Sequence, residues 1–188
     1  ATYVGNQASI VANEKMGFEK ILTLSLKYQE LANIASENRC LIPSTEISLP
    51  DFASFIQGSQ FFKLTKQFLC DGWVVYPANS SILASFYQNH HYAVLQHQNI
   101  IDGLVLYHSP HQSDTLYIPF LEARDRAGYL QLLKHVFAVA AVENRKEIEI
   151  MLPEIPLLRE VITELGFNSW EQEQDFFLYE YPLMRLRS

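Results

Sequence analysis

Two segments far apart in the chain end in the same way. Residues 13–18 read Asn-Glu-Lys-Met-Gly-Phe, and residues 161–167 read Val-Ile-Thr-Glu-Leu-Gly-Phe. In each, a helix-like run stops at Gly-Phe and an apolar, strand-like run follows. Gly17 and Gly166 lie 149 positions apart (166 minus 17), which is about the length of one small domain. This internal repeat predicts the last helix and strand of a first copy, followed by a whole second copy.

Composition and charge exclude several classes of protein. The 188 residues carry a formal net charge of −7, so we expect no basic surface for nucleic acid or an anionic membrane. Hydrophobic residues make up 48% of the chain, which is ample for a packed core. The cysteines, Cys40 and Cys70, form neither a metal-binding spacing nor a disulfide framework. The longest apolar run of the strongest helical segment, residues 136–142, is too short to span a bilayer. We therefore expect a soluble, cytoplasmic protein.

The first third of the chain predicts a helix, a strand and a helical connector. Residues 6–16 are typical of a helix that Asn6 caps and Gly17 ends. Residues 18–26 predict a strand. The connector, residues 29–67, is predicted to contain a short helix near 29–37 and one or two helices in 50–67. Aromatic side chains that need burial support these helices, namely Phe52, Phe55, Phe61 and Phe62.

The pattern becomes regular beyond Cys70. The predicted elements are, in order, a strand at 73–76, a helix at 80–87, strands at 92–95, 100–107 and 116–121, a long helix at 127–143, a strand at 147–152, a helix at 155–165 and a strand at 176–181. A tight polar turn at Gln98-Asn99 joins two of the strands as a hairpin. This order predicts a mixed α/β protein of the α+β class, in which an antiparallel meander leads into β-α-β-α-β.

The N-terminal helix resembles the late helix of the GNAT superfamily of acyl-CoA-dependent N-acetyltransferases. The matching residues are Asn6, Ser9, Val11, Glu14, Lys15, Gly17 and Phe18. Residues 73–182 resemble the same family in element order, in Asp102-Gly103 of the hairpin and in the Leu165-Gly166-Phe167 ending. The resemblance implies a GNAT-like single mixed sheet with helices on both faces, in a tandem protein. Its parts would be residues 1–28 from the first copy, the connector 29–67 and a complete second copy, 68–188.

The resemblance also implies a cosubstrate, acetyl-CoA. In this family, backbone N–H groups at the start of the long helix hold the pyrophosphate, and two splayed parallel strands hold the pantetheine arm. Here those strands would be residues 116–121 and 147–152. The candidate cofactor-binding residues implied in this way are Asn6 and Ser9 in the first copy and Arg124, Arg126, Ala127 and Gly128 in the second.

The second copy departs from the family pattern in the loop before its long helix. The family's Q/R-x-x-G-x-G/A loop lets the backbone approach the phosphates. If Arg124 takes the first position, the two expected glycines become Ala127 and Tyr129. A shift of one place puts Gly128 in the fourth position but leaves Asp125 in the first. Either register places a bulky side chain where the phosphates need bare backbone, so we expect this loop to be closed.

The late helices differ from the family pattern as well. The second copy has no asparagine at the start of its late helix, and the family's tyrosine position holds Ile162. The first copy retains Asn6 and Ser9, although its tyrosine position holds Asn13. We therefore expect a degenerate second copy, and a first copy that holds any catalytic site.

Two residues are the catalytic candidates within the second copy. Glu122 ends a predicted strand beside the expected cleft and is a candidate general base. The alternative for Glu122 is a solvent-exposed carboxylate paired with Arg124 or Arg126. Tyr117 is a candidate proton donor, and its alternative is packing with a wet hydroxyl, as for Tyr129.

Histidines offer a further pair. Hairpin pairing about Gln98-Asn99 would bring His91 near His108. Because no cysteine or carboxylate stands at ligand spacing with them, we expect no metal site.

Two functional hypotheses follow. In the first, the parent protein moves an acetyl group from acetyl-CoA to a small-molecule or peptide amine. In the second, this chain is a non-catalytic GNAT-like module that shapes a substrate cleft, mediates dimerisation or contacts other proteins. Residues 1–27 would then either complete the surface of the second copy or pair with another chain, for example in a homodimer. A weaker third hypothesis is another acyl or nucleotide ligand in the same cleft.

Overall fold

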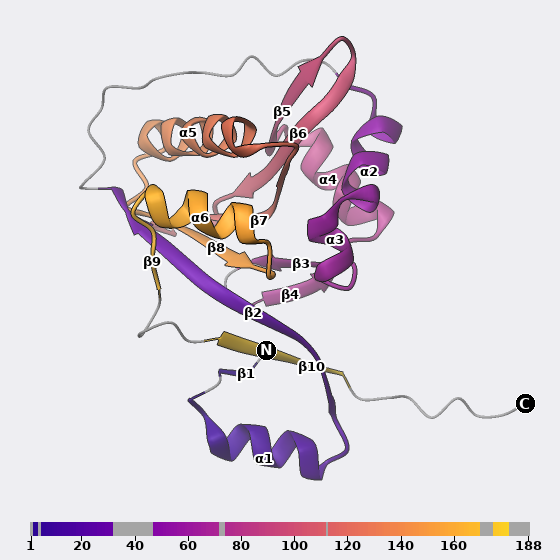
Figure 1. Ribbon diagram of the computed structural model, residues 1–188, viewed down its shortest axis with the longest axis vertical. Helices are drawn as coiled ribbons and strands as arrows, with labels where there is room; N and C mark the ends of the chain where they lie inside the picture. The colour runs from indigo at the N-terminus through magenta and orange to yellow at the C-terminus, as the bar shows by residue number, and fades with distance from the viewer. Residues whose placement is uncertain are drawn as a thin grey trace, which may run out of the picture.

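The computed structural model describes residues 2–3, 5–31, 47–71, 74–111, 113–169 and 175–180. Its centre is one mixed sheet in the strand order β1-β10-β2-β8-β7-β6-β5, with helices on both faces (Figure 1). The elements are β1 (Thr2–Tyr3), α1 (Gln7–Lys15), β2 (Glu19–Glu30), α2 (Leu49–Gly58), α3 (Gln60–Leu64), β3 (Phe68–Asp71), β4 (Val74–Pro77), α4 (Ser80–Gln88), β5 (Tyr92–His97), β6 (Ile100–His108), β7 (Thr115–Ala123), α5 (Arg126–Val142), β8 (Glu147–Leu152), α6 (Pro156–Glu164), β9 (Asn168–Ser169) and β10 (Asp175–Glu180).

The sheet confirms the predicted fold class. Strands β5, β6 and β7 form the antiparallel meander, and β8 then runs parallel to β7. The parallel pairing extends from Thr115 opposite Glu147 to Ile118 opposite Ile150. α5 connects the two parallel strands, as a crossover connection requires.

A bulge at Pro119 changes the course of β7. Leu106 of β6 pairs with Phe120, whereas His108 pairs with Tyr117, so two residues of β7 oppose one of β6. A proline cannot donate a ladder hydrogen bond and is tolerated at such a bulge. The pairing with β8 ends at Ile118, although β7 continues to Ala123. Because cross-strand partners share a face, the bulge places Tyr117 and Phe120 on the same face of the sheet.

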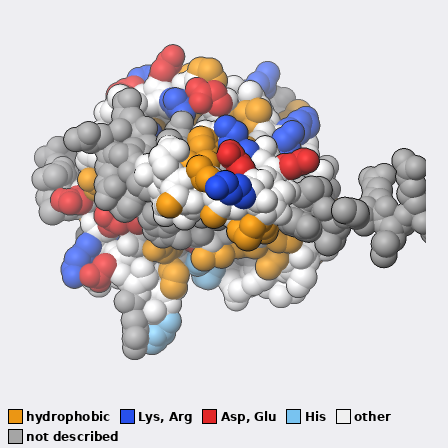
Figure 2. Space-filling model, turned by 90° about the horizontal axis from the view of Figure 1, so that it is seen from below, with side chains coloured by type: hydrophobic (Ala, Val, Ile, Leu, Met, Phe, Trp, Pro, Cys, Tyr) orange, Lys and Arg blue, Asp and Glu red, His pale blue; other side chains and the backbone are white. Residues whose placement is uncertain are grey.

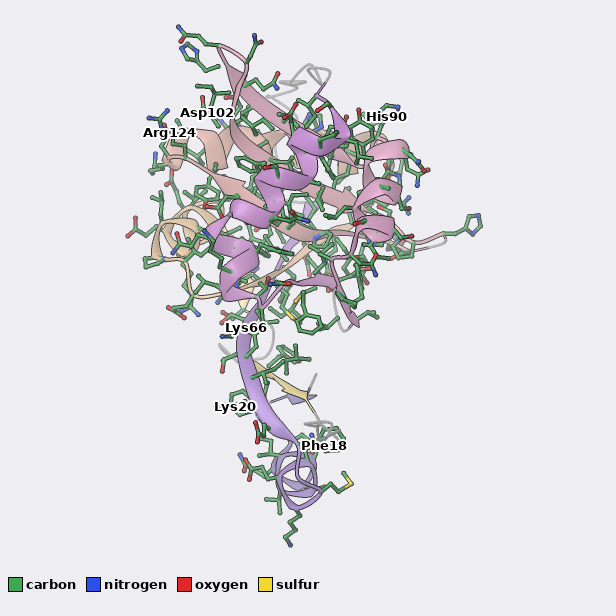
Figure 3. All side chains as sticks on the ribbon, turned by 90° about the vertical axis from the view of Figure 1, so that its right-hand side faces the viewer. Phe18, Lys20, Lys66, His90, Asp102 and Arg124 are labelled. Carbon is green, nitrogen blue, oxygen red and sulfur yellow. The ribbon has the colours of Figure 1, made fainter. Side chains whose placement is uncertain are left out.

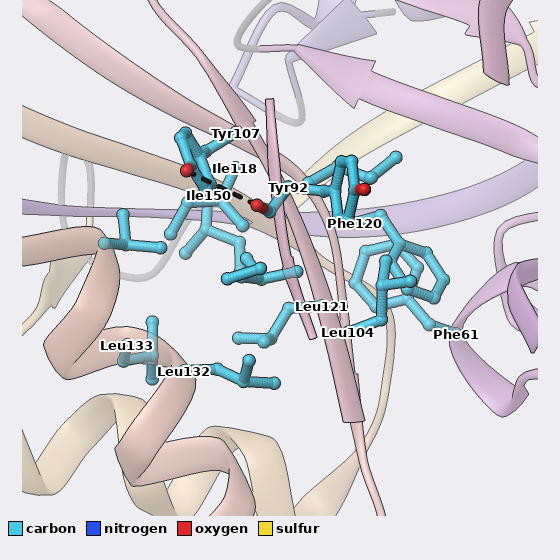
Figure 4. Packing of buried hydrophobic residues seen from close by; sticks show 14 of the residues in the cluster. Phe61, Tyr92, Leu104, Tyr107, Ile118, Phe120, Leu121, Leu132, Leu133 and Ile150 are labelled. Carbon is cyan, nitrogen blue, oxygen red and sulfur yellow. Dashed lines mark hydrogen bonds between the residues drawn. The ribbon is translucent and has the colours of Figure 1, made fainter. Parts of the chain in front are cut away.

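Helices cover the two faces unequally. α5 and α6 pack together on one face, and α2, α3 and α4 cover the other beside the short sheet β3-β4 (Figure 1). On the first face, Leu132 and Leu133 of α5 face Leu121 of β7 (Figure 4). On the second, the rings of Phe61 and Phe120 meet edge to face at 5.3 Å between centroids. Each such side chain contributes about 1.5–3 kcal/mol by leaving water, so the predicted connector helices belong to the core.

The N-terminal strand lies inside this sheet. Residues Ser25 to Glu30 of β2 pair with β8, and the first half of β2 pairs with β10. The strand predicted at 18–26 is therefore longer, and the helix predicted near 29–37 is wrong at its start, because Gln29 and Glu30 belong to β2. Residues 32–37 lie outside the described part of the chain. α1 and the start of β2, near Phe18 and Lys20, project from the body (Figure 3).

The two repeated sequence endings fold identically. Gly17 and Gly166 have φ of 83° and 81°, the left-handed region that glycine adopts without strain. The next residue closes the helix end at both sites, because Phe18 N–H donates to Asn13 O at 3.0 Å and Phe167 N–H to Ile162 O at 3.1 Å. This is the Schellman arrangement, and both repeated sequence endings adopt it.

The short strands β3 and β4 form a separate sheet, whereas β9 pairs with β2 of the main one. The strand predicted at 73–76 is present as β4, and it pairs antiparallel with β3 in a two-stranded sheet that is not part of the main one. β3 packs against β7 and β8. Among the described residues, no helix combines the length and the hydrophobicity that crossing a membrane requires.

Candidate functional site

The start of α5 is occupied by the chain's own side chains. Asp125 caps the helix, and its Oδ1 accepts a hydrogen bond from Gly128 N–H at 2.8 Å. Arg126 forms an ion pair with Glu164 of α6. Nη1 of Arg124 lies 3.5 Å from Oδ1 of Asp102 in β6, and 79% of the Arg124 side chain is exposed. Figure 3 labels both residues, which lie near each other. Neither arginine therefore forms the ion pair with Glu122 that the sequence left open.

Gly128 faces the sheet rather than solvent. A Cβ atom at this position would lie 3.0 Å from Cβ of Ala123 and 3.5 Å from Leu95 Cδ1. The glycine thus allows α5 to approach β7 closely. Ala127, one residue earlier, is exposed.

Tyr129 is buried in the first turn of α5. Its side chain is 2% exposed, and burial, reinforced by the charge of Glu122, raises its pKa to about 12. A hydrogen bond with the backbone of Ala123 partly offsets this shift. The phenol is therefore neutral at ordinary pH and packs as part of the core. Tyr129 is the last residue of the loop 124–129, which the sequence predicted to be closed.

Glu122 binds the connector. Its Oε2 accepts a hydrogen bond from Phe61 N–H at 2.9 Å, at the start of α3. Burial raises the pKa of this carboxyl, while the backbone N–H groups of Phe61 and Gln60 act in the opposite direction. An anionic group at a helix start satisfies orphan N–H donors. Glu122 therefore ties α3 to the end of β7.

A second polar group lies on the same face of the sheet, before the bulge. His108, Tyr117 and Glu149 stand side by side across β6, β7 and β8. Nε2 of His108 donates to Oδ2 of Asp71 at 2.6 Å. Burial, and then the charge of Glu149, raises the pKa of Tyr117. We call Asp71, His108, Tyr117 and Glu149 the acid–imidazole cluster.

Within this cluster, Glu149 has a pKa close to neutral pH. Burial, followed by the neighbouring Glu147 and the charge of Asp71, raises its pKa from 4.5 to about 7. Oε2 of Glu149 and Oδ1 of Asp71 are buried, and neither atom has a hydrogen-bond partner among the described residues. A carboxyl that titrates near neutral pH can accept or donate a proton there. The cluster therefore contains a carboxyl that can exchange a proton near neutral pH, whereas the Glu122 carboxylate accepts the Phe61 N–H of α3.

A cavity of about 300 Å³ adjoins the cluster. Its wall consists of Tyr76, Ile82, Ser85, Phe86, Asn89, His91 and His108. The predicted approach of the two histidines is confirmed, because both line this cavity and His108 helps to lower the pKa of His91, after burial. Among the residues that the structure describes, no three His, Cys, Asp or Glu side chains are arranged to hold a metal ion.

The candidate cofactor residues form two separate groups. Asn6 Oδ1 accepts a hydrogen bond from Ser9 N–H at 3.0 Å, so these two lie together at the start of α1. The other group is at the start of α5. Figure 3 shows Phe18, just after α1, at the opposite end of the molecule from Arg124. The two groups therefore do not form one site within this chain.

Sequence reasoning missed Asp71 and Glu149. The signal for Glu149 was present, since Glu147 and Glu149 alternate in a predicted strand whose intervening residue, Ile148, is buried. Asp71 lies at the end of β3, a strand that the sequence did not predict. Only the packing of β3 over β7 and β8 brings it to His108.

Comparisons with known proteins identify the fold. No protein-family model and no curated protein matches the sequence. The structure is similar to GCN5-related N-acetyltransferases from Sphaerobacter thermophilus (TM-score 0.59, 14% identity), Anabaena variabilis (0.52, 10%) and Kribbella flavida (0.51, 14%). These matches cover 95%, 96% and 95% of this chain but only 57%, 45% and 41% of the other chains. The likeness shows that the chain has the GNAT fold, over about half the length of these structures.

Proposed function

We propose that this chain is the non-catalytic part of a tandem GNAT-type N-acetyltransferase. Acetyl transfer from acetyl-CoA to a small-molecule or peptide amine would take place in the first copy, to which α1 and β2 belong. Residues 68–188 would be the second copy, joined to the first through the connector 29–67. The expected location is the cytoplasm.

The start of α5 carries this proposal. The residues there do not fit the pyrophosphate of an acyl-CoA, because the Asp125 carboxylate already accepts the Gly128 N–H at 2.8 Å. The Asp125 carboxylate would repel a second anion at this helix end. The helix start also offers no exposed glycine backbone whose N–H groups a phosphate could approach. The buried ring of Tyr129 and the inward-facing Gly128 leave no such backbone. Acetyl transfer is therefore assigned to the first copy and not to this one.

The first copy keeps the features that the second lacks. Asn6 and Ser9 match family positions near the cofactor, and Ser9 is only partly buried on α1. Asn6 is exposed, and its Oδ1 caps α1 by accepting the Ser9 N–H. In this proposal the second copy contributes its sheet, on which β2 is held by pairing with β8.

A second candidate places chemistry in this copy. Glu149, with a pKa of about 7, lies beside Tyr117 and near the 300 Å³ cavity. A small amine in that cavity would contact His108 of the acid–imidazole cluster, in which Glu149 can accept a proton near neutral pH. The observation favours acid–base chemistry, and it does not supply a site for the acyl donor.

Calorimetric titration with acetyl-CoA tests the proposal. The comparison uses this chain and an extended protein that includes the roughly 130 residues upstream of Ala1 in the proposed tandem arrangement. We expect saturable binding by the extended protein only. Ser9→Asp should abolish it, whereas Arg126→Ala, at the start of α5, should leave it unchanged. Binding of acetyl-CoA by the short chain, or loss of binding in Arg126→Ala, would place the cofactor in the second copy and contradict the proposal.

A further inference from the structure

Strands β2 and β10 pair as equivalent parts of the repeat. β2 follows the helix that ends at Gly17, and β9 and β10 follow the helix that ends at Gly166. The start of β2 pairs with the end of β10, through Lys20 opposite Tyr179 and Glu19 opposite Glu180. An antiparallel pair of equivalent strands is what a local two-fold relation between two copies produces.

The other end of the pair repeats this relation. The residues 149 positions after Glu19 and Lys20 are Asn168 and Ser169 (19 plus 149, 20 plus 149), which form β9. β9 pairs with the end of β2, through Tyr28 opposite Asn168. The start of β2 therefore lies opposite the end of β10, and β9, which is equivalent to the start of β2, lies opposite the end of β2.

The outer neighbours are equivalent too. β2 pairs with the end of β8, through Met151 opposite Leu26 and Leu152 opposite Ser25. The residues 149 positions before this end of β8 are Thr2 and Tyr3 (151 minus 149, 152 minus 149), which form β1. β1 pairs antiparallel with β10, at Phe177 and Phe176. β1 thus stands to β10 as the end of β8 stands to β2.

We propose that the two copies exchange their last strands. β2, from the first copy, closes the sheet of the second beside β8. β10, from the second copy, closes the sheet of the first beside the strand whose end is β1. The outer edge of β10 is therefore the surface on which the first copy's sheet continues. This inference rests on the tandem arrangement of the proposed function, and it names the contact between the copies.

The surface of α1 fits the same partner. Its equivalent, α6, packs against α5 and buries Leu158, Val161 and Ile162. α1 buries Ile10 alone among its described residues, and Val11 and Met16 are 43% and 57% exposed. Figure 2 views the molecule from the α1 end and shows hydrophobic side chains exposed among charged ones. We infer that the first copy's counterpart of α5 packs against this face of α1.

Hydrogen exchange of the extended protein and of this chain tests the exchange of strands. In the extended protein, amides of α1 and β10 should be protected about 100-fold more than in this chain. Amides of β5, the edge strand at the far end of the sheet, should not change and serve as the control. Protection gained by α1 but not by β10 would show that the first copy closes its own sheet, and the inference would be wrong.

A proline variant gives an independent readout. Leu178→Pro interrupts β10, so in the extended protein it should reduce protection of upstream amides at least 10-fold while α5 stays protected. Gln96→Pro, in β5, should leave the upstream amides unchanged. Light scattering that shows this chain as a dimer with protected β10 would assign the edge to a second copy instead. Failure of acetyl-CoA to bind the extended protein would contradict the proposed function alone.

Discussion

The carboxylate of Glu122 accepts the Phe61 N–H at the start of α3, so its position at the end of β7 serves a contact between the connector and the sheet. Removing a buried acceptor leaves that N–H without a partner. Glu122→Ala should therefore lower the free energy of unfolding by about 1–3 kcal/mol. Glu122→Gln should cost less, because an amide oxygen still accepts. Urea denaturation measures both, and equal, negligible effects would show that the contact contributes nothing to stability.

Glu149 should make stability depend on pH. Its pKa is raised from 4.5 to about 7 in the folded protein, so the folded state keeps a proton that the unfolded state has released between these values. The resulting stabilisation is complete below pH 4.5 and is lost as the pH rises to about 7. Glu149→Gln removes this dependence. At pH 8 it should be more stable than the wild type by about 1–2 kcal/mol, allowing for the partial exposure of the group.

Denaturation at pH 5 and pH 8 measures this difference. Glu160→Gln, on the exposed side of α6, is the matched control and should follow the wild type at both values. A Glu149→Gln variant with the wild-type slope between pH 5 and pH 8 would assign the proton to another group.

At the level of elements, the backbone conformation at two helix-end glycines predicts how their replacement by alanine changes stability. Gly166 has a φ of +81°, and the nearest atom to an added Cβ is Gln29 Oε1 at 3.5 Å, so an alanine there meets backbone strain but no clash. Gly166→Ala should lower stability by about 1 kcal/mol. For Gly58, in α2, no atom of the described residues lies within 4 Å of an added Cβ. Gly58→Ala should therefore leave the melting temperature unchanged or raise it slightly.

Scanning calorimetry of the two alanine variants decides this prediction. A Gly166→Ala protein that melts with the wild type would mean that the Schellman end of α6 carries no cost for a left-handed alanine. Gly17 and Gly166 would then share a backbone conformation, but this conformation would not require glycine for stability.

Elements set by local sequence were predictable. The hairpin is one, since Gln98 and Asn99 have φ of 50° and 65°, the left-handed backbone of a tight turn. The capped start of α4 at Asn79 is another. The placement of β2 between β8 and β10 was not, because strand pairing joins residues more than 120 positions apart, such as Leu26 and Met151. For the same reason the sequence pointed to Glu122 as a candidate general base, since nothing nearby in sequence shows that the start of α3 donates a hydrogen bond to its carboxylate.

At the scale of the whole molecule, the chain combines a GNAT-fold body with a projecting helix and strand (Figure 3). The repeat at 149 residues appears in the helix ends, in the β2-β10 pairing and in the positions of β1 and β8. Under the proposed function, the body supplies a sheet to a catalytic neighbour and leaves its own helix start closed. The two copies would then differ in chemistry while sharing one backbone plan.

The central claim is that the start of α5 does not receive acetyl-CoA. The most direct measurement is a titration of this chain with acetyl-CoA, followed by the backbone amide chemical shifts of Arg126 to Tyr129. We predict no saturable shift at these amides at cofactor concentrations up to about 1 mM, which corresponds to a binding free energy weaker than about −4 kcal/mol. A saturable shift centred on Gly128 would contradict the account, because it would show that the Asp125 carboxylate yields this helix end to a phosphate.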